Sequence, residues 1–328
     1  MFFLMCSERS GSNFITKLLN GHNNICGPST KHIINPVARN LFRYGNLKNK
    51  QNWTELLKDI ERLLKVRFSI WKHEFDLNEL ETLAPTGDIK SLIKNIFLAE
   101  AKANGKQHIF IKENQIYEFL PFLLINYPEA KYIYLTRDPR DMALSWKKNE
   151  IHPGGVVKAA QQWRKDQQNN IKNYVELKKI GKAHFVKYED LISDAKTQLE
   201  AIISFLGLPY DPNIQNYYKD ELTQKNASMQ KAWNNLSKEI IVNNKRKYLN
   251  ELDTIEIKVV EKICFLEMQW LGYQTEHTKS ELNDVHQNII EELNVVDLIN
   301  LKANRTEGVL ANMEAKKIFY QKDSSKML

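Results

Sequence analysis

A short polar loop near the N-terminus contains the residue types that bind phosphate. It consists of Arg9, Ser10, Gly11, Ser12 and Asn13. The apolar run 2–6 before it predicts a buried strand, and the apolar spacing of residues 14–19 after it predicts a helix. Backbone N–H groups and the positive end of that helix would converge on one point, Gly11 allows close approach, and Arg9 adds a charge. The loop therefore predicts an anion site, with an ordinary strand-to-helix turn as the alternative.

The loop is not a Walker A motif. That motif requires four residues between its glycines, followed by Gly-Lys-Ser/Thr. The loop contains only Gly11, and Lys17 comes later, within the predicted helix. The missing lysine and hydroxyl argue against a magnesium-nucleotide kinase, which we keep as an alternative.

A second strand-to-helix turn offers another anion-binding pair. Arg137 follows the predicted strand 131–136, and Asp138 and Pro139 are typical of a helix start. Ser145 lies two turns into that helix. A guanidinium and a hydroxyl placed in this way could bind a phosphate; the alternative is a salt-bridged cap with a tolerated serine.

A third cation, Lys112, belongs to the polar residues that end the predicted strand 108–114. The alternation of strands and helices indicates a parallel sheet, whose ligands lie at the carboxyl ends of the strands. Arg9, Lys112 and Arg137 all lie at such ends. We therefore expect an α/β fold with a central parallel sheet flanked by helices, and one ligand site at this edge.

These residues resemble motifs of sulfotransferases that use 3′-phosphoadenosine 5′-phosphosulfate (PAPS). The run Arg-Ser-Gly-Ser-Asn is similar to their 5′-phosphosulfate loop, and Arg137 with Ser145 is similar to their 3′-phosphate motif. The run Val-Lys-Tyr-Glu-Asp-Leu resembles the segment whose tyrosine holds the adenine, here Tyr188; a core tyrosine is the alternative. The resemblance extends over roughly residues 1–275 and implies a P-loop-like sulfotransferase fold, PAPS as sulfuryl donor and the product 3′-phosphoadenosine 5′-phosphate (PAP).

The resemblance also implies roles for individual residues. The expected nucleotide-binding set is Arg9, Ser10, Gly11, Ser12, Asn13, Phe14, Arg137, Ser145, Tyr188, Lys245, Arg246 and Lys247. The last three belong to a segment, 220–247, that we expect to be a loop laid over the ligand. Arg9 and Lys112 would stabilise the leaving phosphate, and no metal is expected. Asn114 occupies the position at which cytosolic members of the family have a histidine that acts as the general base. We therefore take His32 as the first candidate for the general base and Glu113 as the second.

Composition restricts the remaining possibilities. The chain has 47 Lys+Arg against 40 Asp+Glu, a net charge of +7, and contains no block of five consecutive basic residues. This distribution favours a polyanionic small ligand over nucleic acid, although a non-catalytic nucleic-acid or scaffold protein stays an alternative. No apolar run is long enough to span a membrane and no signal peptide is evident, so a cytoplasmic location is expected.

The chain divides into a predicted sulfotransferase domain, 1–275, and a C-terminal helical extension, 276–328. A helical stripe of apolar residues in the extension predicts an extra helix that docks on the body or on a second copy, forming a homodimer. The acceptor of the sulfuryl group stays open between a carbohydrate, a peptide tyrosine, a lipid and another small molecule.

Overall fold

The structure, a computed structural model, describes residues 1–149, 154–300 and 306–321. Five strands form one parallel sheet in the order β2-β3-β1-β4-β5. They are β1 (Phe2–Cys6), β2 (Ile25–Cys26), β3 (His108–Lys112), β4 (Lys131–Thr136) and β5 (Ala183–Lys187). The chain leaves β1 toward β2 at one edge of the sheet and leaves β4 toward β5 at the opposite edge, so the carboxyl ends of β1 and β4 border a crevice suited to a ligand.

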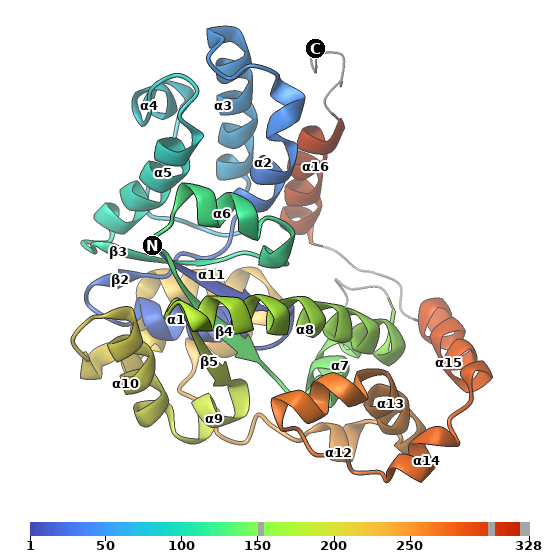
Figure 1. Ribbon diagram of the computed structural model, residues 1–328. Helices are drawn as coiled ribbons and strands as arrows, with labels where there is room; N and C mark the ends of the chain where they lie inside the picture. The colour runs from blue at the N-terminus through green and yellow to red at the C-terminus, as the bar shows by residue number, and fades with distance from the viewer. Residues whose placement is uncertain (150–153, 301–305, 322–328) are drawn as a thin grey trace.

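Helices cover both faces of the sheet (Figure 1). On one face lie α1 (Ser12–Asn20), α9 (Tyr188–Ser193), α10 (Ala195–Leu206) and the 3₁₀ helix η3 (Pro212–Lys219). On the other lie α5 (Ile89–Ala103), α6 (Leu120–Asn126), α7 (Pro139–Lys147), α8 (Val156–Lys179) and α13 (Thr254–Leu271). The remaining helices are α2 (Ile34–Asn40), η1 (Leu41–Tyr44), α3 (Lys50–Lys65), α4 (Leu77–Thr82), η2 (Ile116–Glu118), α11 (Glu221–Met229), η4 (Lys231–Ser237), α12 (Tyr248–Glu251), α14 (Lys279–Asn283), α15 (Gln287–Asn300) and α16 (Glu307–Gln321).

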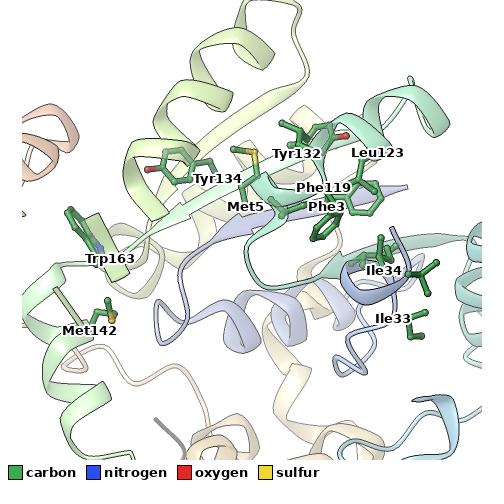
Figure 2. Packing of buried hydrophobic residues seen from close by; sticks show 14 of the residues in the cluster. Phe3, Met5, Ile33, Ile34, Phe119, Leu123, Tyr132, Tyr134, Met142 and Trp163 are labelled. Carbon is green, nitrogen blue, oxygen red and sulfur yellow. The ribbon is translucent and has the colours of Figure 1, made fainter. Parts of the chain in front are cut away.

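Strand β1 is apolar throughout because both of its faces are buried, as is usual in a parallel sheet. Phe3 and Met5 pack with Tyr132 and Tyr134 of β4 on one side of the sheet (Figure 2). Alternate residues of β1 pack on the other side against α1 and α10. Below the end of β4, the indole N–H of Trp163 donates to the carbonyl oxygen of Arg137 at 3.0 Å. The core thus fixes the strand ends that carry the predicted site.

The expected fold class is confirmed, and the bounds predicted for β1 and β4 agree with the structure. One local expectation is wrong. The segment 220–247 is not simply a loop, because it contains α11 and η4, whose Ala227, Trp233 and Leu236 form a small apolar cluster of their own. The expected helical extension is present, and its described residues form three helices, α14, α15 and α16.

The described extension packs on the body of its own chain. Helix α14 contacts α13, α15 contacts α8, and α16 returns to lie beside α2 and α3 (Figure 1). Within the described residues, no helix combines the length and the apolar character needed to cross a membrane.

Candidate active site

The anion loop connects β1 to α1. Gly11 precedes the helix with φ +88°, and its carbonyl oxygen accepts from the Ile15 N–H at 3.1 Å. Glycine adopts this left-handed conformation readily, and it has no side chain to cap the helix. Gly11, Ser12 and Asn13 line a cavity. The N-terminus of α1 therefore borders the cavity, where its partial positive charge favours an anion.

Two arginines and a serine join the ends of β1 and β4. The Arg9 Nε–H donates to Ser145 Oγ at 3.1 Å, and Arg137 Nη1 donates to the Arg9 carbonyl oxygen at 3.3 Å. The Arg137 guanidinium also lies 4.5 Å from the centre of the Tyr188 ring. The structure thus brings together Arg9, the pair of Arg137 and Ser145, and Tyr188, which the sequence predicted from three separate motifs.

The electrostatics of this cluster favour an added negative charge. Burial, and secondarily the charge of Arg137, lowers the pKa of Arg9 to about 10. Arg137 Nε is buried, and the described residues give it no hydrogen-bond partner. A bound phosphate would offset the repulsion between the guanidinium groups and could satisfy the unpaired donor. The residues present therefore fit a phosphorylated ligand.

The cavity beside these cations has a volume of about 490 Å³. Its lining includes these predicted residues: Arg9, Gly11, Ser12, Asn13, Phe14, Arg137, Ser145, Tyr188 and Lys247. The Phe14 ring meets the Tyr188 ring edge-on at 6.0 Å between centroids. Trp233, which the sequence reasoning missed, adds another aromatic side chain to the wall. A cavity lined by both cations and aromatic rings suits a nucleotide.

Hydrogen bonds that are partly or fully buried hold the segment after η4 at the wall of the cavity. The Asp141 carboxylate accepts from the Arg246 N–H at 2.6 Å and from the Tyr248 N–H at 3.2 Å. Arg137 Nη2 donates to the Asn244 carbonyl oxygen at 3.1 Å, and the Asn244 amide donates to the Tyr188 hydroxyl at 2.7 Å. Asp141 stands in the Arg-Asp-Pro-Arg-Asp run, but its partners are distant in the sequence and could not be read there.

Three predicted nucleotide-binding residues do not line the cavity. The Ser10 hydroxyl is buried and donates to the Ser7 carbonyl oxygen at 2.7 Å, so it stabilises the loop from within. Lys245 donates to Ser193 at 2.5 Å, and Arg246 forms an ion pair with Glu276 at 3.0 Å. Of the three consecutive basic residues 245–247, Lys247 is the one that lines the cavity.

The three remaining candidates gather in a second, buried cluster at the end of β3. His32 Nδ1 lies 3.4 Å from Glu113 Oε2, and Glu113 Oε1 accepts from the Ile34 N–H at 3.1 Å. Lys112 is 8% exposed, and its charge acts on both His32 and Glu113. Burial lowers the pKa of His32 well below its ordinary value and raises the pKa of Glu113 to about 7.

Aromatic rings connect this cluster to the cavity. The His32 ring lies 5.8 Å from that of Phe68, which meets Trp233 edge-on at 5.4 Å. The Asn114 amide also donates to the carboxylate of Glu8, so the residues after β3 contact the residue just before the anion loop. The predicted catalytic and nucleotide-binding residues are therefore neighbours at one edge of the sheet.

Backbone strain marks the same places. Among the described residues other than glycine, positive φ angles occur at Arg9 (62°), His32 (56°), Gln115 (51°) and Arg246 (56°). Such conformations cost energy and tend to occur at functional sites. Arg9, His32 and Arg246 were already candidates on sequence grounds that did not involve backbone angles, so the strain is a further indication of the site.

Comparisons with known proteins agree with the geometry. Residues 2–212 match the model of the sulfotransferase family. The fold is similar to the sulfotransferase domain from the curacin biosynthetic pathway, at 20% identity and a TM-score of 0.54 over 84% of this chain and 98% of that one. It is also similar to the sulfotransferase domain of the Synechococcus PCC 7002 olefin synthase, at 19% identity and a TM-score of 0.54 over 84% and 94%. The curated proteins compared give no match.

Proposed function

The chain belongs to the sulfotransferase family, and we propose that it moves a sulfuryl group from PAPS to an acceptor hydroxyl or amine by in-line transfer. The observation that carries this proposal is the cation cluster at the ends of β1 and β4, where Arg9, Arg137 and Ser145 border a nucleotide-sized cavity. PAPS supplies the sulfuryl group and a phosphate leaving group.

The residues of the cavity divide between the parts of the nucleotide. Arg9 and the N-terminus of α1 would bind the 5′-phosphosulfate, because both present positive charge beside Gly11. Arg137, Ser145 and Lys247 would bind the 3′-phosphate. The aromatic rings in the wall would hold the adenine. The contact between Arg9 and Ser145 couples the two phosphate regions, so that binding at one helps to position the other.

Charge stabilisation and proton removal would come from the two clusters together. As the acceptor atom attacks sulfur, the bond from sulfur to the bridging oxygen breaks and PAP leaves with the electron pair. Arg9 and Lys112 would neutralise the growing charge on the phosphate. His32 is uncharged at neutral pH and can accept the acceptor's proton, while Glu113, 3.4 Å away, would stabilise the imidazolium.

A thermal-shift comparison of PAP with magnesium-ATP tests the nucleotide assignment. A ligand at 100 times its dissociation constant stabilises a protein by about 2.7 kcal/mol, so PAP should raise the melting temperature by several degrees. Magnesium-ATP should have a much smaller effect. A kinase would show the opposite preference, and a nucleic-acid or scaffold protein would respond to neither, so either result would refute the proposal.

Catalysis is tested by the release of PAP from PAPS in the presence of an acceptor panel: a sugar, a tyrosine peptide, a long-chain alcohol and a phenol. With the best acceptor of high pKa, His32→Ala should reduce turnover roughly a hundredfold while the thermal shift with PAP is kept. Unchanged turnover would remove His32 from the mechanism and leave Glu113 as the base.

A further inference from the structure

Helix α16 lies against the segment that carries His32. Asn312 donates to the Lys31 carbonyl oxygen at 3.3 Å, and the Tyr320 hydroxyl donates to Asn35 Oδ1 at 3.2 Å. Figure 1 shows α16 beside α2 and α3, far in sequence from both. The helix also lies outside residues 2–212, the range matched by the family model.

Helical spacing places Lys316 between these two contacts. Residues 312, 316 and 320 are four apart, so their side chains share one face of the helix. Since Asn312 lies over Lys31 and Tyr320 over Asn35, Lys316 faces the backbone between them. That backbone includes His32, and the N–H of residue 34 is the donor to Glu113. Lys316 is half-buried in this position.

The surroundings of Lys316 show which groups it acts on. Burial lowers the pKa of Lys316 to about 8, although Glu113 and, more weakly, Glu8 favour its charged form. In return, Lys316 and Lys112 oppose the rise that burial causes in the pKa of Glu113. The charges of both lysines also lower the pKa of His32, in the same direction as its burial.

We propose that Lys316 is a positioning residue of the reaction centre, whose ammonium favours the ionised form of Glu113 and the uncharged form of His32, the two forms in which the pair can take up the acceptor's proton. This inference rests on the proposed function. The C-terminal extension would then contribute to catalysis, because Lys316 of α16 adds a positive charge beside the cluster of His32, Lys112 and Glu113.

The test uses the full chain labelled with carboxyl-¹³C glutamate. The Glu113 signal is identified by its loss in Glu113→Gln and followed by NMR as a function of pH. In Lys316→Met, the midpoint of Glu113 should rise by about one pH unit or more, because a nearby opposite charge is lost while the aliphatic stem is kept. Lys316→Arg should restore the midpoint. Lys317→Met is the matched control, since its exposed side chain pairs with Glu314 and carries the same charge.

An unchanged midpoint in Lys316→Met, or an equal shift in Lys317→Met, would overturn the inference. The thermal shift with PAP is measured on the same samples. It should persist in Lys316→Met, because Lys316 does not line the cavity, and its selective loss would count against the proposed role. A wild-type protein that does not respond to PAP would instead refute the proposed function, while the NMR titration would still decide the electrostatic role.

Discussion

Replacing Arg137 with alanine should weaken the binding of PAP far more than that of AMP, which lacks the 3′-phosphate. Arg137 lies at the end of β4, 3.3 Å from the Arg9 carbonyl oxygen, and has a buried, unpaired Nε. A hydrogen bond to a charged group contributes about 1.5–3 kcal/mol, so losing one such contact should raise the dissociation constant for PAP roughly tenfold to a hundredfold. The dissociation constant of Arg137→Lys for PAP should lie between those of the wild type and Arg137→Ala, because lysine keeps the charge but lacks the planar guanidinium that can donate two parallel hydrogen bonds.

Isothermal titration calorimetry at fixed pH and ionic strength would measure both dissociation constants in each variant. The ratio of the PAP constant to the AMP constant is the informative quantity. Arg137 also donates to the Asn244 carbonyl oxygen at 3.1 Å, and damage to that segment would weaken both ligands alike. A ratio unchanged from the wild type would show that Arg137 does not bind the 3′-phosphate, and the assignment of the two phosphates would be wrong.

Two further predictions concern a glycine and a buried carboxylate. Gly11→Ala should abolish most PAP binding and lower stability by more than the roughly 1–2 kcal/mol cost of a left-handed alanine, because the new Cβ would lie 2.4 Å from the Tyr188 ring. The control is Gly181→Ala, where φ is +68° and no atom lies within 4 Å of the new Cβ, so only the backbone cost should appear. Equal losses of stability in the two variants would contradict the reasoning. Burial raises the pKa of Glu113 from 4.5 to about 7, so the native state retains a proton that the unfolded state has lost, and stability should fall as pH rises from about 4.5 to 7. Glu113→Gln should therefore stabilise the protein by roughly 2–3 kcal/mol at pH 7 but little at pH 4.5, as measured by urea unfolding. Glu176→Gln, at an exposed position, should leave the stability unchanged. A Glu113→Gln protein that is less stable than the wild type at pH 7 would refute the argument.

Much of the site could be predicted from the sequence because its elements are local. The anion loop and the turn from Arg137 to Ser145 are each contiguous, and each combines an apolar strand, a polar turn and a helix start. A parallel sheet brings the carboxyl ends of its strands to one edge whatever the detailed packing. The fold class and the family therefore followed from short motifs and their order.

Only the tertiary structure decided which side chains meet. The bond from Arg9 to Ser145 spans 136 positions of sequence, and the clamp of Asp141 on the Arg246 backbone spans 105. Nothing local distinguishes Lys247, which lines the cavity, from Arg246, which turns to Glu276. The place of Lys316 beside Glu113 depends on how α16 packs on α2 and α3, and such packing is set by the shape of the whole core. Local patterns determine helices, strands and turns, whereas contacts between distant side chains depend on the summed packing of all of them.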